Sequence, residues 1–239
     1  MRVLVVVPAF NEVESLPVTL AEIRARAPGV DVVVVDDGSS DGTQAAARAA
    51  GVPVLALPVN LGVGAALQTG FLYALEEGYD VAVQLDADGQ HDPADLPVLL
   101  EPLEKGRANL SIGSRYVEGA SLYHAPFLRR VGMMLFSALA TAVTGRPLKD
   151  TTSGYRAYDR GVMALCRTEF PQDFPDAPLL IQVARAGFVL EEVPVSMRPR
   201  TRGQSFYTWT RSLYYPYKTL LASLVLLLRR PPQRIGGPS

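Results

Sequence analysis

Several residue types are scarce in this chain of 239 residues, and each scarcity narrows the classes of function open to it. A single cysteine, Cys166, rules out a disulfide within the chain and fits a reducing compartment. The two histidines, His91 and His124, stand far apart, with no Cys/His spacing that indicates zinc and no basis for a Ser/His/Asp triad. We expect both to be polar surface groups or supports for a neighbouring site.

Long hydrophobic runs are also absent. The chain starts with an apolar stretch, but Pro8 and Asn11 end it well short of the hydrophobic core of a signal peptide, so we do not expect secretion. Two later uncharged stretches cover residues 131–145 and 219–228. The second reaches about 15 Å as a helix, which is half of a ~30 Å hydrocarbon core. We expect neither stretch to span a membrane.

Acidic residues are missing from the last part of the chain. All 24 acidic residues occur up to Glu192, whereas eight of the 23 basic residues follow it. These eight are Arg198, Arg200, Arg202, Arg211, Lys218, Arg229, Arg230 and Arg234. Such a basic tail predicts an anionic partner, which is nucleic acid, a substrate phosphate or lipid headgroups.

The composition around residues 219–228 favours lipid over nucleic acid. This apolar stretch is flanked by aromatic and basic residues, namely Trp209, Tyr214, Tyr215, Tyr217, Arg229 and Arg230. That arrangement is typical of a helix lying in the headgroup region of a membrane. The alternative for this stretch and for residues 131–143 is a core helix or a helix at a homo-oligomer contact.

The first 114 residues alternate between short β-branched runs and Ala/Leu-rich amphipathic stretches. The pattern predicts strands at residues 3–7, 32–35, 54–57, 81–85 and 110–112, and helices at 12–27, 42–50, 65–77 and 93–104. Alternation of this kind indicates an α/β fold with a mostly parallel sheet and helices on both faces. Ligands bind such sheets beyond the carboxyl ends of the strands, where Asn11-Glu12, Asp36-Asp37-Gly38 and Asp86-Ala87-Asp88 all fall.

Asp86 and Asp88 are the most informative pair in the sequence. They follow the apolar run 81–85 with one residue between them, so strand alternation predicts that both carboxylates point the same way. Neighbouring carboxylates repel unless a cation lies between them, and hard oxygen ligands suit Mg²⁺ or Mn²⁺ serving a substrate phosphate. A simple Asp/Gly turn is the alternative interpretation. Earlier in the chain, Asp36 and Asp37 end a predicted strand and are suited to accept hydrogen bonds from ribose hydroxyls or a base.

Seven motifs occur together in a recognisable order. They are Pro8-Ala9-Phe10-Asn11-Glu12, Asp36-Asp37-Gly38-Ser39-Ser40-Asp41-Gly42-Thr43, Asn60-Leu61-Gly62, Asp86-Ala87-Asp88-Gly89-Gln90-His91-Asp92-Pro93, Gly113-Ser114-Arg115-Tyr116, Ser153-Gly154-Tyr155-Arg156-Ala157 and Glu192-Val193-Pro194-Val195. With this set the chain resembles the family 2 glycosyltransferases of the GT-A fold, within the dolichol- or polyprenyl-phosphate mannosyltransferase-like branch. The resemblance covers roughly residues 3–206.

The resemblance implies roles for individual residues. Those matching positions that hold the nucleotide are Pro8, Phe10, Glu12, Asp37 and Asp86, and those matching the ligands of Mg²⁺ or Mn²⁺ are Asp86, Asp88 and Gln90. Arg115 and Arg129 match positions that grip the acceptor phosphate, and Arg200 matches one that closes over the donor phosphates. Asp88, Arg115 and Arg200 are accordingly the expected catalytic residues.

The implied reaction moves a hexose of mannose or glucose type from a GDP- or UDP-hexose to a polyprenyl or dolichyl phosphate, with inversion. A lipid phosphate is already anionic at neutral pH, so no strong general base is needed. Catalysis then rests on positioning and on charge neutralisation of the leaving nucleoside diphosphate. We expect a protein at the cytoplasmic face of the membrane, peripherally attached, with no nucleic-acid partner.

Some positions depart from the family pattern. Pro178 stands where a glutamate often occurs, and Phe206 stands where a lysine often follows the Gly-x-Ser motif. Gly132-Met133 replaces serines that some members have. These departures concern the acceptor and the sugar, so the alternative is the same fold acting on a glycan or another non-lipid acceptor. We expect a catalytic domain over residues 1–206 that includes an interfacial helix near 127–144, an amphipathic membrane-associated segment over 207–230, and a tail over 231–239.

Overall fold

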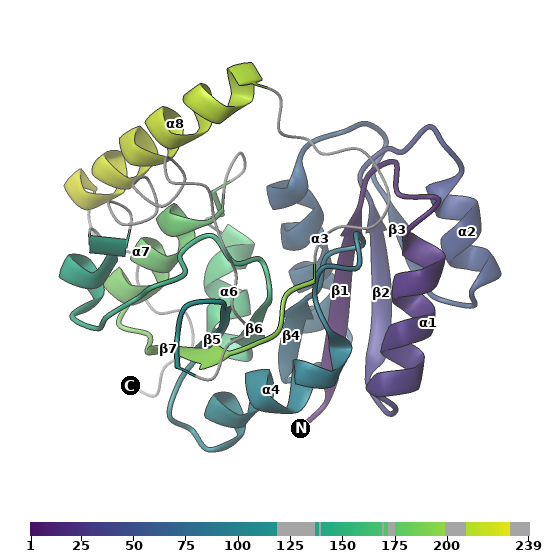
Figure 1. Ribbon diagram of the computed structural model, residues 1–239, viewed down its shortest axis with the longest axis horizontal. Coiled ribbons are helices and arrows are strands. Elements are labelled where there is room, and N and C mark those ends of the chain that lie inside the picture. The colour runs from purple at the N-terminus through teal and green to yellow at the C-terminus, as the bar shows by residue number, and fades with distance from the viewer. Residues whose placement is uncertain (119–136, 139, 169, 172–174, 199–208, 230–239) are drawn as a thin grey trace.

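Seven strands form one sheet among the residues that the structure describes (Figure 1). The computed structural model describes residues 1–118, 137–138, 140–168, 170–171, 175–198 and 209–229. The strands are β1 (Val3–Ala9), β2 (Asp31–Asp36), β3 (Val54–Ala56), β4 (Val81–Gln84), β5 (Leu110–Ser114), β6 (Arg156–Asp159) and β7 (Leu190–Pro194). Their order is β3-β2-β1-β4-β6-β5-β7. All neighbours pair in parallel except β6, which runs antiparallel to β4 and β5.

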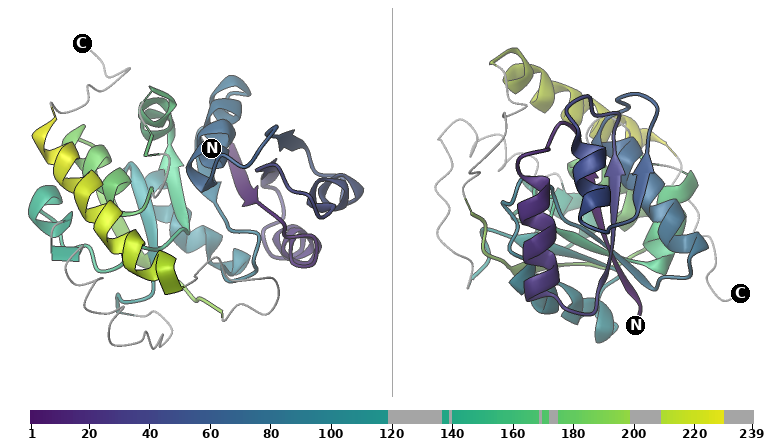
Figure 2. Two further views of the ribbon diagram at one scale, coloured as in Figure 1. Left: turned by 90° about the horizontal axis from the view of Figure 1, so that it is seen from above. Right: turned by 90° about the vertical axis from the view of Figure 1, so that its right-hand side faces the viewer.

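Helices cover both faces of this sheet, as the two turned views in Figure 2 show. One face packs against α1 (Leu16–Arg26), α2 (Thr43–Ala49) and α4 (Leu96–Glu104) through a core that includes Leu20 and Leu99. The other face packs against α3 (Val63–Glu76), α6 (Arg160–Thr168) and α7 (Ala177–Arg185) through a core that includes Phe71 and Leu180. The prediction of a mostly parallel α/β sheet covered on both faces is confirmed.

The five predicted strands and four predicted helices of residues 1–114 are all present, with shifted ends. The helix expected from residue 12 starts at Leu16, because Asn11 has a positive φ of 54° and the chain turns before the helix begins. The helix expected over 93–104 begins with a 3₁₀ turn, η1 (Pro93–Asp95), and continues as α4. The later elements β6, α6, α7 and β7 were not predicted from periodicity.

The C-terminal stretch forms the helix α8 (Trp209–Leu228), which packs on α7. The predicted helix near residues 127–144 falls largely outside the described residues, and its described part, 137–138 and 140–144, is helical. No helix in the described ranges combines the length and the hydropathy needed to cross a lipid bilayer. The domain boundaries given above stay predictions.

Candidate active site

The loops that follow β1 and β2 are tied together by hydrogen bonds at the carboxyl edge of the sheet. The backbone N–H of Asn11 donates to Ser39 Oγ over 2.9 Å, and the backbone N–H of Ser40 donates to Asn11 Oδ1 over 2.9 Å. Glu12, which is buried, donates its backbone N–H to Thr43 Oγ1 and accepts a hydrogen bond from Ser15 Oγ at its carboxylate. The predicted convergence of these two polar clusters is therefore observed.

Asp37 joins a third loop to this pair. Its Oδ1 accepts the backbone N–H of Leu61 at 2.7 Å, and its Oδ2 accepts that of Gly62 at 2.9 Å. The approach is close because Gly38 has no side chain, and a Cβ there would lie 2.6 Å from the backbone carbon of Val59. Asp37 thus fixes the entry to α3. Its contact with a nucleotide, like those of Pro8, Phe10 and Glu12, stays a prediction.

The acid pair lies just beyond β4, which ends at Gln84. Leu85 and Ala87 are buried, whereas Asp86 and Asp88 are half-buried, so both acids lie on the outward side of the loop. The strand ends before the two acids, but buried and half-buried residues continue to alternate through residues 85–88 of the loop. The backbone N–H of Gln90 donates to Asp88 Oδ1 over 3.0 Å, which closes a turn around the second acid.

A hydrogen bond to the segment after β7 orients the side-chain amide of Gln90. Its Nε2 donates to the carbonyl of Arg198 over 3.3 Å, which assigns the other amide atom, Oε1, as an acceptor. Two carboxylates and one amide oxygen in a single loop are the hard donors that Mg²⁺ and Mn²⁺ prefer. No cluster of three or more His, Cys, Asp or Glu side chains suited to a metal occurs in the described part of the chain. An ion at Asp86, Asp88 and Gln90 would therefore complete its coordination with substrate or water oxygens.

His91 lies behind the acid pair and not on the surface. It is 2% exposed, and its ring stacks on Tyr155 with centroids 4.8 Å apart and planes 8° from parallel. Burial lowers the pKa of His91 to about 4, so its ring is neutral at neutral pH. Of the two roles expected for this residue, the structure excludes the surface one and retains that of a support.

Arg198 corrects the expectation that the whole basic tail needs an external anion. Its Nη1 contacts both carboxylate oxygens of Glu22, at 3.1 and 2.9 Å, and its Nη2 donates to Asp92. Its backbone N–H donates to the carbonyl of Gln90 over 2.9 Å. At least one of the eight tail cations is thus balanced within the chain, and it fastens the segment after β7 to the acid-pair loop.

Arg115 directly follows β5 and pairs with a buried acid. Its Nε and Nη2 donate to the two oxygens of Asp150, each over 2.7 Å, and Nη2 also donates to Thr152 Oγ1. Asp150 is fully buried, and its own backbone N–H donates to Glu192 Oε1 over 2.6 Å. Burial raises the pKa of Glu192. The predicted role of Arg115 as a phosphate contact stays a prediction, and the bidentate pair shows what holds it in place.

Gly154 forms the wall opposite the first acid of the pair. A Cβ at this position would lie 3.0 Å from Asp86 Oδ2 and 2.9 Å from Gln84 Nε2. Gln84 Nε2 in turn donates to Asp86 Oδ1 over 3.2 Å. The absence of a side chain at residue 154 therefore leaves the space that the Asp86 carboxylate occupies.

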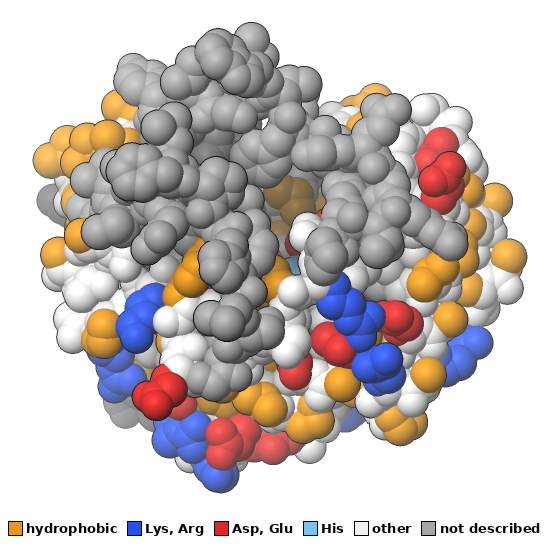
Figure 3. Space-filling view, viewed as in Figure 1, with side chains coloured by type: hydrophobic (Ala, Val, Ile, Leu, Met, Phe, Trp, Pro, Cys, Tyr) orange, Lys and Arg blue, Asp and Glu red, His pale blue; other side chains and the backbone are white. Residues whose placement is uncertain are grey.

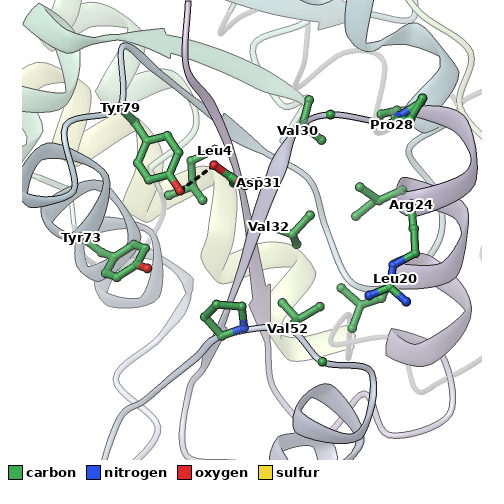
Figure 4. A pocket seen from close by; sticks show the side chains of 15 residues that line it. Leu4, Leu20, Arg24, Pro28, Val30, Asp31, Val32, Val52, Tyr73 and Tyr79 are labelled. Atoms are coloured by element: carbon green, nitrogen blue, oxygen red, sulfur yellow. Dashed lines mark hydrogen bonds between the residues drawn. The ribbon is translucent and has the colours of Figure 1, made fainter.

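A cavity of about 450 Å³ lies at the other end of the strands, far from these acids in the fold. Figure 4 shows it around the start of β2, where Tyr79 donates to Asp31 Oδ2 over 2.9 Å between largely apolar side chains. Asp31 begins β2 and Asp37 follows its end, so this cavity and the candidate site lie at opposite edges of the sheet. We assign the site by its convergent polar groups and not by this cavity.

The predicted site residues Arg129 and Arg200 lie outside the described residues, as do His124, Gly132, Met133 and Phe206. The sequence did not indicate the supporting roles of Asp150, Gly154 and Arg198, and it left that of His91 open. The motif Ser153-Gly154-Tyr155-Arg156 carried the only signal for Gly154.

Comparison with known proteins identifies the family of the chain. Residues 4–165 match the model of glycosyl transferase family 2. The chain belongs to this family. Among its relatives, this family 2 glycosyltransferase is 38% identical over 213 residues to the undecaprenyl-phosphate mannosyltransferase of Micrococcus luteus, covering 86% of this chain and 87% of that protein. It is 36% identical over 213 residues to the polyprenol monophosphomannose synthase of Mycolicibacterium smegmatis, covering 85% and 80% of the two chains.

Solved structures agree with the fold of this family 2 glycosyltransferase. The glucosyl-3-phosphoglycerate synthase of Mycobacterium tuberculosis, crystallised with Mn²⁺ and UDP-glucose, aligns with a TM-score of 0.70. The alignment covers 94% of this chain and 78% of the synthase at 23% sequence identity. Since the identity is low, this likeness concerns the fold alone.

Proposed function

We propose that this family 2 glycosyltransferase is an inverting enzyme that moves a hexose from a nucleotide sugar to a polyprenyl phosphate. The observation that carries the proposal is the combination of a relative named undecaprenyl-phosphate mannosyltransferase, 38% identical over 86% of the chain, with an acid pair beside the loops of β1 and β2. The linked loops after β1, β2 and β3 form a polar edge suited to a nucleoside. The adjacent acid-pair loop suits a diphosphate neutralised by a divalent ion.

Asp86, Asp88 and Gln90 would hold this ion, and their oxygens fit its chemistry. When bound, Mg²⁺ or Mn²⁺ would neutralise charge on the departing nucleoside diphosphate. The chain's own groups position the donor, because the loops around Asn11, Asp37 and Asp86 are each fixed by backbone hydrogen bonds. A phosphate acceptor is already an anion, so displacement at the anomeric carbon needs no histidine base.

The surface of α8 supports a peripheral attachment to a membrane, and we propose that it is the cytoplasmic face. Leu221, Leu224, Val225 and Leu228 are spaced along one side of the helix and are 48%, 45%, 40% and 88% exposed. Figure 3 shows hydrophobic side chains on this end of α8. The exposed Arg229 follows them, which adds a cation for anionic headgroups. We call these four side chains the α8 stripe.

A transfer assay tests the proposed reaction. The protein is incubated with undecaprenyl phosphate, Mn²⁺ and labelled GDP-mannose, UDP-glucose or UDP-N-acetylglucosamine in separate reactions, and label is counted in the organic phase. We expect label with one donor, loss of label in excess chelator, and recovery on adding Mn²⁺. Asp88→Ala should abolish transfer while the unfolding midpoint stays close to that of the parent. Transfer that survives chelator would overturn the role of the ion, and label entering only a water-soluble glycan would overturn the lipid acceptor.

Vesicle binding tests the α8 stripe separately. Leu224→Glu and Leu228→Glu should weaken cosedimentation with phosphatidylglycerol vesicles by about tenfold or more, since burying one leucine is worth about 1.5–3 kcal/mol. Val18→Glu is the matched control, because Val18 on α1 is 47% exposed and lies outside the stripe. Equal binding by all three variants and the parent would contradict the assignment.

A further inference from the structure

His91 contacts Asp86 through both the backbone and the side chain of that residue. The backbone N–H of Asp86 donates to His91 Nδ1 over 3.1 Å. Because Nδ1 accepts this hydrogen bond, the ring proton is assigned to Nε2, which lies 3.8 Å from Asp86 Oδ2. One imidazole thus fixes the backbone of Asp86 and presents an N–H toward its carboxylate.

The ring of His91 cannot easily turn away from this position. Tyr155, the residue before β6, stacks on it, and the backbone of His91 forms an antiparallel bridge with Met197. The hydroxyl of Tyr155 donates to the carbonyl of Asp92 over 3.0 Å, so the same tyrosine also holds the far end of the loop. The acid-pair loop is therefore held by Tyr155, just before β6, on one side and by the segment after β7 on the other.

We propose that His91 is a positioning residue that preorganises Asp86 for a divalent ion; this inference rests on the proposed function and deepens its metal step. Two half-buried carboxylates in one loop repel each other when no cation is present. A rigid partner that holds one of them in place lowers the cost of gathering them around the ion. Groups that orient a metal's ligands in this way typically contribute about 10–100-fold to metal affinity.

Two substitutions separate the contacts that His91 makes. His91→Phe keeps a flat ring on Tyr155 but removes both nitrogens. His91→Asn restores an acceptor near the place of Nδ1 and loses the stack. Tyr155→Phe is the matched control, because it removes a hydrogen bond to the same loop, at Asp92, and leaves the ring that stacks on His91.

The measurement is the dissociation constant of GDP, and in parallel of UDP, by calorimetry with and without Mn²⁺. The ratio of the two constants isolates the contribution of the ion. We expect His91→Phe to reduce this ratio by about 10–100-fold with metal-free nucleotide affinity unchanged, His91→Asn to recover part of it, and Tyr155→Phe to stay within about twofold of the parent.

Two results overturn the inference. One is an unchanged ratio in His91→Phe, and the other is an equal loss in Tyr155→Phe, which would show that general loosening of the loop is responsible. If Mn²⁺ has no effect on nucleotide binding even in the parent protein, the metal step of the proposed function fails instead. Asp88→Ala measured beside these variants keeps the two failures apart, because it must lose the Mn²⁺ effect wherever the parent shows one.

Discussion

Replacing Gly154 by alanine would place one methyl group against the acid pair without changing any polar residue. Gly154 does not have a positive φ, so its backbone accepts an alanine. The new Cβ would stand 3.0 Å from Asp86 Oδ2 and 2.9 Å from Gln84 Nε2, where ordinary contact begins at 3.4 Å. Both atoms must therefore retreat by about 0.4–0.5 Å.

We expect this displacement to have a small effect on the free energy of unfolding and a large effect on the transfer rate. The atoms that must move are the ends of flexible side chains, so we expect a loss of unfolding free energy near 1 kcal/mol, the low end of the usual ~1–3 kcal/mol for overpacking. A misplacement of ~1 Å at an active site can cost about 100-fold in rate. For about half of that shift we expect a roughly tenfold loss of transfer rate and a weaker effect of Mn²⁺ on nucleotide binding.

Gly161→Ala provides the matched control. Its Cβ would lie 2.9 Å from Phe188 Cε1, so the contact is as short, but it presses on the core beneath α6 and not on the acids. Urea unfolding and the transfer assay are measured on both variants. Gly161→Ala should lose about 1–3 kcal/mol of unfolding free energy and transfer hexose at the parent rate. A Gly154→Ala protein that transfers hexose at the parent rate with the same Mn²⁺ dependence would refute the assignment of Asp86 to the ion.

Three further predictions concern the supports of the site and the core. Asp150→Ala should lower the free energy of unfolding, measured in urea, by about 3–5 kcal/mol, because it leaves the buried guanidinium of Arg115 without its bidentate partner. A decrease below about 1 kcal/mol would contradict this. Gly38→Ala should lower the free energy of unfolding by about 2–4 kcal/mol and weaken metal-free nucleotide binding, since Gly38 has a φ of +72° and a Cβ there would meet the backbone of Val59. Unchanged binding would show that this turn is not part of the nucleotide site. Burial raises the pKa of Cys166, so a thiol reagent should label it only after unfolding, and rapid labelling of the native protein would show that α6 opens.

The first half of the fold was predictable because its strands are apolar on both faces. Runs such as residues 32–35 lie buried between two helix layers, and a parallel sheet needs that pattern. β6 was missed for the opposite reason. Its four residues, Arg-Ala-Tyr-Asp, contain no apolar run, and the strand exists because Arg156 and Tyr158 find partners from outside it.

The acids of the site were predictable, and the residues that position them were not. Asp37 and Asp86 each follow a strand of the parallel part of the sheet. The carboxyl ends of parallel strands lie at the same edge, so the two acids are expected to come close together. For His91 the sequence left a surface role and a supporting role open, and the stack on Tyr155 and the bridge to Met197 decide for the supporting role. Arg198 was read as part of a basic tail because Glu22, its partner, lies 176 residues earlier.

The direction of β6 explains why this site needs a segment that strand-end reasoning leaves out. In a wholly parallel sheet, only the carboxyl ends of strands reach the ligand edge. Because β6 runs antiparallel, with Arg156 opposite Gln84 of β4, the residues that precede it, including Gly154, lie beside those that follow β4. A glycine is required there because two segments of the chain approach from opposite directions and the Asp86 carboxylate occupies the space between them. The segment that leads into the reversed strand thus supplies the wall of the acid pair through Gly154 and, through Tyr155, the ring on which His91 stacks.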